Sequence, residues 1–236
     1  MTNIPTERQN QDPSIRALRL DDLDSCLALS TEAGWNQNKN DWRLLLQVCS
    51  GYGIDVPGYG LAGTTMAWEL GERNAWINMV LVAKAYRGRG FARELMAACL
   101  GDLASAQRLA MLDATDLGFN VYSKFGFSGK NRIARLYRES ETESSAPISS
   151  SADGLLLKAM RAEDIDQVAN LDLRVIGIDR ENVLADFYRR ESEAAWVARD
   201  VSGSLRGFVL GRDGRIATQI GPIVAETRTV AEALLR

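Results

Sequence analysis

Histidine is absent from this 236-residue sequence, and its absence excludes several kinds of active site. A Ser/His/Asp triad, a histidine general base and histidine metal ligands all need that side chain. Cysteine is scarce as well, and Cys26, Cys49 and Cys99 form no Cys-x-x-Cys pair. We therefore expect no bound metal.

The three cysteines are odd in number, widely spaced and set in apolar patterns of helical period, such as Ser-Cys-Leu-Ala-Leu at residues 25–29. This predicts buried, reduced thiols, and it favours a cytoplasmic protein. The first 13 residues contain no apolar signal core, and no apolar run is long enough to cross a bilayer. We expect neither secretion nor a membrane partner.

The sequence also has no large excess of either positive or negative charge. The sequence has 28 basic and 31 acidic residues, a net charge of −3, and no long basic block. This balance gives no reason to expect binding to nucleic acid or to an anionic membrane. The 46% hydrophobic content is ordinary for a soluble globular protein and allows a packed core. No feature of the sequence predicts a particular oligomeric state.

Two polar segments divide the chain. Residues 1–13 are predicted to be a disordered lead-in, and residues 139–153, rich in Ser and Glu, to be a linker. Domains are therefore predicted over residues 14–138 and 154–236.

The two predicted domains begin alike. Residues 15–24, Ile-Arg-Ala-Leu-Arg-Leu-Asp-Asp-Leu-Asp, resemble residues 157–166, Leu-Lys-Ala-Met-Arg-Ala-Glu-Asp-Ile-Asp. Each reads as a short strand, an acidic helix start and an amphipathic helix. Duplication explains this pattern, and the alternative is convergence on a common strand-to-helix sequence.

Strands and helices alternate along the first domain. Residues 59–70 and 75–83 predict two strands joined by the hairpin turn Gly-Glu-Arg-Asn. A helix with one apolar stripe follows from Gly90. A strand over 108–114, a helix over 117–125 and one or two final strands over 127–138 complete the pattern. The fold class is therefore α/β or α+β with a mixed sheet.

The segment between the second strand of this hairpin and the helix is built to hold a phosphate. A helix N-terminus presents unpaired N–H groups and a partial positive charge. Gly88, Gly90 and Ala92 allow close approach of the backbone, while Arg87 and Arg89 add charge that can reach phosphate oxygens. The alternatives are a plain glycine turn with solvated arginines and an Arg-Gly contact to RNA.

Two motifs in order resemble the GCN5-related N-acetyltransferase (GNAT) superfamily. Residues 87–92, Arg-Gly-Arg-Gly-Phe-Ala, are similar to its Arg/Gln-x-x-Gly-x-Gly/Ala signature, and residues 122–127, Tyr-Ser-Lys-Phe-Gly-Phe, resemble its Tyr-x-Lys-x-Gly-Phe segment. The resemblance implies a GNAT fold, acetyl-CoA as cosubstrate and an amine acceptor that attacks the thioester directly. It implies cofactor contacts at Arg87, Gly88, Arg89, Gly90, Phe91 and Ala92.

The same resemblance assigns further roles. Tyr122 matches the tyrosine that protonates the CoA sulfur, although the plain alternative is an aromatic side chain packed under the Gly126 turn. Backbone groups of the predicted fourth strand would contact the pantetheine arm, and one N–H would hold the carbonyl oxygen; these are Met79, Val80, Leu81 and Val82. Thr115 stands where many members carry an asparagine that contacts the cofactor, which is a departure from the pattern.

The general base and the acceptor site are less defined. Glu69, Glu72 and Asp113 are the available carboxylates, a water relay is also open, and Asn78 occupies a strand position where an acid would be informative.

The loop that covers the substrate in this fold contains, or lies next to, Trp35, Asn36 and Trp42. They predict binding of a small amine or amino acid, unless the two tryptophans only pack the helix pair.

The second domain resembles the degenerate copy of tandem acetyltransferase-like proteins. Its turn, residues 224–230, contains no glycine and puts Glu226 where phosphate would bind, so no cofactor is expected there. The sequence stops inside a predicted helix, which indicates either a fragment or a half-domain that docks elsewhere. Three functions follow: a small-molecule N-acetyltransferase, a non-catalytic acyl-CoA-binding regulatory module, or acetylation of protein N-termini, for which no peptide groove is visible.

Overall fold

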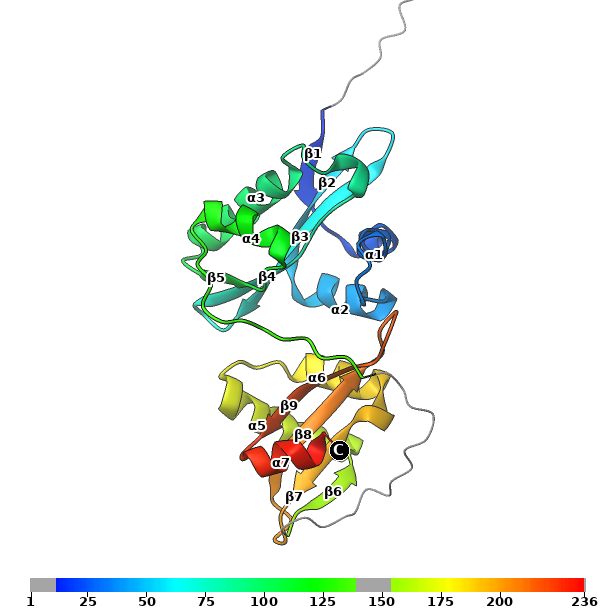
Figure 1. The fold of residues 1–236 in the computed structure, drawn as a ribbon, viewed down its shortest axis with the longest axis vertical. Coiled ribbons are helices and arrows are strands. Elements are labelled where there is room, and N and C mark those ends of the chain that lie inside the picture. Colours follow the sequence, from blue (N-terminus) through cyan, green and yellow to red (C-terminus); the bar gives the residue numbers. More distant parts are fainter. Residues whose placement is uncertain (1–11, 139–153, 236) are drawn as a thin grey trace, which may run out of the picture. The chain divides into compact units, whose positions relative to one another are not determined.

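The computed structural model describes residues 12–138 and 154–235 (Figure 1). The predicted linker and nearly all of the predicted lead-in lie outside these ranges. By its contacts the chain forms two compact units, one of residues 1–113 and 214–216, the other of residues 114–213 and 217–236. The domain boundaries read from the sequence remain a prediction.

The first unit is built on a five-stranded sheet in the order β1-β2-β3-β4-β5. Neighbouring strands are antiparallel except β4 and β5, which are parallel. The predicted hairpin is confirmed, because β3 and β4 pair across the turn at residues 71–73. The strands are β1 (Ser14–Ala17), β2 (Ser50–Val56), β3 (Gly60–Leu70), β4 (Asn74–Val82) and β5 (Leu109–Leu112).

Helices cover both faces of this sheet (Figure 1). α1 (Leu23–Glu32) and α2 (Lys39–Val48) pack on one face, where Cys26, Trp42 and Met66 are buried together. α3 (Phe91–Ser105) packs on the other face against Ile54 and Ala62. The predicted stripe of α3 is confirmed at Leu95, Met96, Cys99 and Leu103, which are buried, whereas Ala92, also predicted for it, is half-buried. Short 3₁₀ turns precede α1 (η1, Leu20–Asp22) and follow β4 (η2, Lys84–Tyr86).

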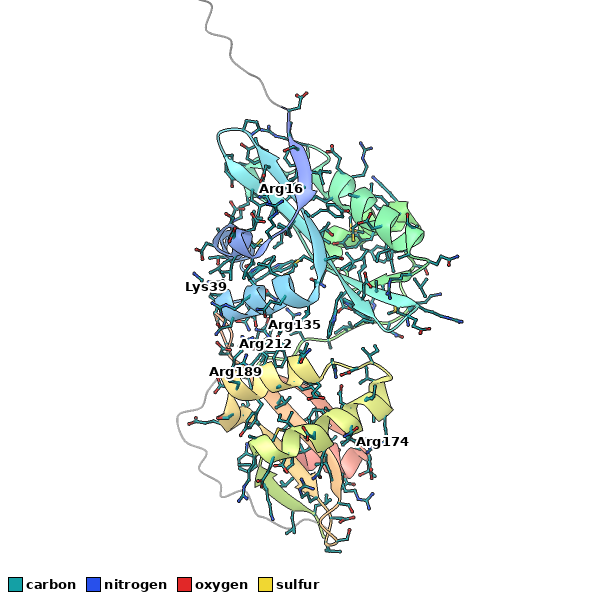
Figure 2. All side chains as sticks on the ribbon, turned by 180° about the vertical axis from the view of Figure 1, so that it is seen from behind. Arg16, Lys39, Arg135, Arg174, Arg189 and Arg212 are labelled. Atoms are coloured by element: carbon teal, nitrogen blue, oxygen red, sulfur yellow. The ribbon has the colours of Figure 1, made fainter. Side chains whose placement is uncertain are left out.

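Local sequence explains where these helices begin. The Asn38 side chain accepts hydrogen bonds from the N–H groups of Asn40 and Asp41, so α2 is capped at its first turn. Before α1, Asp22 accepts from the Arg19 N–H and pairs with Arg16, which Figure 2 labels on β1. The Arg16 guanidinium holds the pKa of the Asp22 carboxyl below its usual value.

Residues 114–138 contain one short helix, α4 (Asp116–Tyr122), followed by a 3₁₀ turn, η3 (Ser123–Phe125). The predicted helix over 117–125 is confirmed. The predicted final strands over 127–138 are wrong, because this segment has no regular secondary structure. Its apolar side chains are exposed, with Ile133 at 72% and Leu136 at 89%. A strand needs a neighbouring strand to pair with, and the local sequence does not supply one.

The second unit repeats the plan of the first with a four-stranded antiparallel sheet in the order β6-β7-β8-β9. Val168, Leu184 and Phe208 form its core with α5 and α6, while Val230 of α7 packs with Ala198. The elements are β6 (Leu156–Ala159), η4 (Ala162–Asp164), α5 (Ile165–Ile176), α6 (Glu181–Arg190), η5 (Ser192–Ala194), β7 (Trp196–Arg199), β8 (Leu205–Arg212), β9 (Gln219–Ala225) and α7 (Arg228–Leu234).

The two sheets share irregularities as well as strand order. In the β3–β4 pair two steps of β3 oppose three of β4, from Met66–Asn78 to Thr64–Leu81. In the β8–β9 pair two steps of β8 likewise oppose three of β9, from Gly211–Ile220 to Val209–Ile223. A bulge at the same point of both hairpins is a feature of one fold used twice.

Among the helices of the described residues, none combines the length and the apolar character that crossing a membrane requires.

Candidate functional site

The turn between η2 and α3 has the backbone that its glycines predict. Gly88 has a φ of +77°, and Gly90, the residue before α3, has a φ of +90°. Residues that carry a Cβ rarely adopt such positive φ values. Apart from Gly88 itself and its two neighbours in the chain, no heavy atom of the described residues lies within 4 Å of the place where a Cβ of Gly88 would stand. The turn is therefore open above its backbone, as a ligand approaching the main chain requires.

The first turn of α3 offers unpaired donors. Gly90 has no side chain to cap the helix, and its carbonyl accepts from the N–H groups of Arg93 and Glu94. The N–H groups of Phe91 and Ala92 lie in the first turn, where no preceding helical carbonyl can accept them. With the helix dipole, this arrangement favours an anion.

Arginine and aromatic side chains surround this turn. The Arg87 Nε donates to the Val82 carbonyl at 3.1 Å, which leaves the rest of its guanidinium for other acceptors. The Arg89 guanidinium lies 4.9 Å from the centre of the Tyr86 ring, and that ring stacks on Phe91 at 5.9 Å. Both guanidinium groups are exposed. The residues present thus fit a diphosphate, which needs backbone donors and positive charge together.

The strand that leads into the turn is bulged. Met79 has φ of +49°, unusual for a residue with a side chain, and its carbonyl accepts a hydrogen bond from the Thr64 hydroxyl at 2.7 Å. β4 pairs with β5 only from Asn74 to Ile77, so within the described residues the β4 edge beyond Ile77 has no strand beside it. Backbone groups of residues 79–82 are the ones that this splay opens.

Tyr122 ends α4, in the second compact unit, and is half-buried. Its ring contacts Phe127 edge to face, with centroids 6.3 Å apart, and covers Gly118, where a Cβ would stand 2.7 Å from the ring. Burial raises the pKa of its hydroxyl above 10, so the phenol stays protonated at neutral pH. That is the form a proton donor needs.

Thr115 caps α4. Its hydroxyl accepts a hydrogen bond from the Gly118 N–H at 3.2 Å. The hydroxyl therefore has a structural partner in this fold, and the cofactor contact predicted for it remains a prediction.

The two tryptophans in and next to the loop between α1 and α2 differ in burial. Trp42 is fully buried, and its indole N–H donates to the Ser30 hydroxyl at 2.8 Å. Trp35 and Asn36 are only half-buried. Trp35 packs against the same cluster as Met79, so the loop and the β4 bulge share one hydrophobic neighbourhood. Trp42 has the surroundings of a core residue, and the acceptor contact predicted for it remains a prediction.

The carboxylates predicted as possible bases are all exposed. Glu69 pairs with Arg108 at 2.7 Å, Glu72 lies in the β3–β4 turn, and Asp113 follows β5 directly. In the described part of the chain no three cysteine or carboxylate side chains gather as a metal site would require.

The corresponding turn of the second unit is much shorter. Residues 83–90 join β4 to α3, whereas only Glu226 and Thr227 join β9 to α7. Thr227 caps α7 by accepting from the Val230 N–H, and Glu226 pairs with Arg206 at 2.8 Å. This turn places a carboxylate and a hydroxyl at the helix start instead of open glycine backbone.

Two residues at the site were not predicted. Thr64 holds the bulge through Met79, and the Glu32 carboxylate accepts from the Lys84 N–H at 2.8 Å at the start of η2. Their partners lie 15 and 52 positions away in the sequence. No local motif signals such contacts, because the pairing depends on strand register and on where α1 ends.

Known proteins resemble both halves of the chain. The acetyltransferase (GNAT) family matches residues 21–127, and an acetyltransferase (GNAT) domain matches residues 168–236. A candidate acetyltransferase structure from Pyrococcus horikoshii is 23% identical, with a TM-score of 0.66 over 95% of this chain and 75% of its own. A probable N-acyltransferase structure from Enterococcus faecalis V583 is 16% identical, with a TM-score of 0.65 over 95% of this chain and 62% of its own. No curated protein matches the sequence.

Two sheets that share the order of their first four strands, each with a bulged hairpin and each overlapped by a GNAT family match, define a tandem arrangement of two GNAT-like domains. The chain belongs to the GNAT superfamily, with one GNAT domain following another.

Proposed function

We propose that the first domain is an acetyl-CoA-dependent N-acetyltransferase that acts on a small amine or amino acid. The observation that carries this proposal is the pairing of an open glycine turn, at Gly88 and Gly90, with the bulged strand that leads into it. The turn suits a diphosphate, and the bulge exposes backbone groups beside which an extended ligand can lie. The free thiols of the chain suit a reducing compartment such as the cytoplasm.

Each part of the site has a task in this proposal. Bound acetyl-CoA supplies an activated acetyl group. The N–H groups of Phe91 and Ala92 and the guanidinium groups of Arg87 and Arg89 hold its diphosphate. Backbone groups of residues 79–82 position the pantetheine arm, and one N–H among them stabilises negative charge on the carbonyl oxygen.

Group transfer then needs two proton movements. The acceptor nitrogen forms a bond to the carbonyl carbon while the carbon–sulfur bond breaks, and the sulfur takes the phenolic proton of Tyr122. The acceptor's own proton leaves to a water or a carboxylate. In this proposal Trp35 and Asn36 contact the acceptor, and Trp42, whose indole N–H donates to Ser30, supports their loop from the core.

The test combines calorimetry with product analysis. Wild-type protein is expected to bind acetyl-CoA and to acetylate members of a panel of amino acids, polyamines and amino sugars, detected by mass spectrometry. Absence of acetyl-CoA binding would overturn the proposal.

Tyr122→Phe tests the proton donor. It is expected to lower kcat about 100-fold, because the departing sulfur loses its acid, while the Kd for acetyl-CoA stays within about twofold of wild type. An equal loss of affinity and turnover would indicate that the ring only packs against Phe127 and Gly118.

A second function has one observation in its favour. Asn78, and not a carboxylate, precedes the bulge on β4, which suits a regulatory module that binds acyl-CoA without transferring the acyl group. Tight acetyl-CoA binding with no product across the amine panel would favour this function over transfer.

A further inference from the structure

Asn78 is a half-buried amide on β4, one residue before the bulge at Met79. It faces the side of the sheet that α1 and α2 cover, because it pairs with Met66 of β3 and its Nδ2 lies 3.9 Å from the Cys49 sulfur, just after α2. This is also the face on which Trp35 and Met79 pack. Asn78 therefore stands in the neighbourhood proposed for the acceptor.

The orientation of its amide is fixed by a backbone group. Nδ2 donates to the Trp76 carbonyl oxygen at 3.2 Å, and a carbonyl can only accept, so the amide nitrogen must face it. The amide oxygen then faces elsewhere. This oxygen is fully buried, and within residues 12–138 and 154–235 no group donates a hydrogen bond to it. A buried acceptor without a donor is unfavourable, and proteins retain few of them.

The residues around Asn78 show where this oxygen lies. The β4–β5 ladder ends at the Ile77–Leu112 pair, so Asn78 is the first β4 residue beyond it. The residue at the next register position is Asp113. Cys49 is the titratable side chain in contact with Asn78, and burial raises the pKa of its thiol to about 12, so the thiol is uncharged at neutral pH. Among the described residues no protein donor meets the amide oxygen, which lies just beyond the point where β4 and β5 separate.

We propose that Asn78 Oδ1 accepts a hydrogen bond from the amine of the acetyl acceptor and so orients its nitrogen at the β4 bulge. This rests on the proposed function. An amide oxygen binds the amine but cannot remove its proton. Transfer at this site therefore depends on an acceptor that arrives already deprotonated or that loses its proton to water or to a carboxylate elsewhere.

The experiment compares Asn78→Leu, Asn78→Asp and the control Asn74→Leu, an asparagine on the same face of the same strand four residues earlier. The probe is the best primary amine from the panel described above. Asn78→Leu is expected to raise the KM for that amine about tenfold or more, with the Kd for acetyl-CoA within about twofold of wild type. Its unfolding temperature is expected not to fall, because the substitution removes an unsatisfied buried oxygen. Asn74→Leu leaves both constants unchanged.

Asn78→Asp separates orientation from structure. The carboxylate keeps an acceptor and adds a base, so the KM is expected to lie closer to wild type than in Asn78→Leu. The rising limb of kcat/KM against pH is expected to move to lower pH.

An unchanged amine KM in Asn78→Leu would overturn the inference, because the oxygen would then be satisfied by water. Loss of both stability and acetyl-CoA binding in Asn78→Leu would overturn it too. So would identical amine KM values and pH profiles in Asn78→Asp and Asn78→Leu. If wild-type protein transfers acetyl to no amine, the proposed function itself fails, and the inference with it.

Discussion

Single residues at the turn between η2 and α3 are expected to determine both its backbone conformation and the affinity for acetyl-CoA. Gly90 is the clearest case, since its φ of +90° is costly for any residue with a Cβ. Gly90→Ala is expected to destabilise the first domain by about 1–3 kcal/mol and to weaken acetyl-CoA binding, because the backbone must shift where the donors converge. Chemical denaturation and calorimetry measure the two effects.

Gly71→Ala is the matched control for this substitution. Gly71 has φ of +61° in the β3–β4 turn, with open space around it. A similar loss of stability with unchanged acetyl-CoA affinity is expected. Loss of affinity in both variants would mean that destabilisation, and not the geometry of the turn, controls binding.

The buried thiols make stability depend on alkaline pH. Burial raises the pKa of Cys26 to about 12 and that of Cys99 to about 11, from 9.0 in an exposed thiol. The folded state therefore keeps its thiol protons above pH 9 while the unfolded chain releases them. The free energy of unfolding is expected to hold below pH 9 and to fall as the pH rises towards 11 and 12.

Urea denaturation at pH 8 and pH 10.5 measures this slope. Cys26→Ala should show a shallower decrease than wild type, whatever its absolute stability. A steeper or equal decrease would show that other groups, such as the tyrosines, dominate the alkaline limb.

At the scale of secondary-structure elements, the bulge of β4 decides where backbone donors are exposed. The Thr64 hydroxyl holds this bulge through the Met79 carbonyl. Thr64→Val keeps the shape of the side chain but removes the donor, so a loss of about 1 kcal/mol in stability and a weaker affinity for acetyl-CoA are expected. Thermal unfolding and calorimetry test both.

Thr65→Val is the corresponding control, because Thr65 is equally buried but lies on the opposite face of β3, next to Cys99. Its acetyl-CoA affinity should equal that of wild type. If both variants bind acetyl-CoA as wild type does, the Thr64 hydroxyl has no part in shaping the site.

At the scale of the whole molecule, two GNAT domains occur but only one has the glycine turn. The second domain joins β9 to α7 by Glu226 and Thr227 alone, and Glu226 is paired with Arg206. Calorimetry is therefore expected to give one acetyl-CoA per chain, and Gly90→Ala should weaken that single site. Two equivalent sites, or a site insensitive to Gly90→Ala, would contradict this assignment.

Local patterns predicted most of the elements correctly. The stripe of α3, the hairpin turn at residues 71–73 and the repeated start of both domains follow from spacing and turn chemistry, which act over a few residues. The strands predicted over 127–138 failed for the opposite reason, since pairing depends on a distant neighbour. Thr64 and Glu32 were not predicted for the same reason, because their partners, Met79 and Lys84, are distant in the sequence.

The sequence by itself determined the family motifs, the absence of histidine chemistry and the position of the open turn at Gly88 and Gly90. Only the tertiary structure decided that Trp42 is a core residue, that Thr64 supports the bulge and that Asn78 carries a buried oxygen to which none of the described residues donates. The reason is physical: backbone preference and periodicity are local, whereas burial and hydrogen-bond satisfaction depend on which segments pack together.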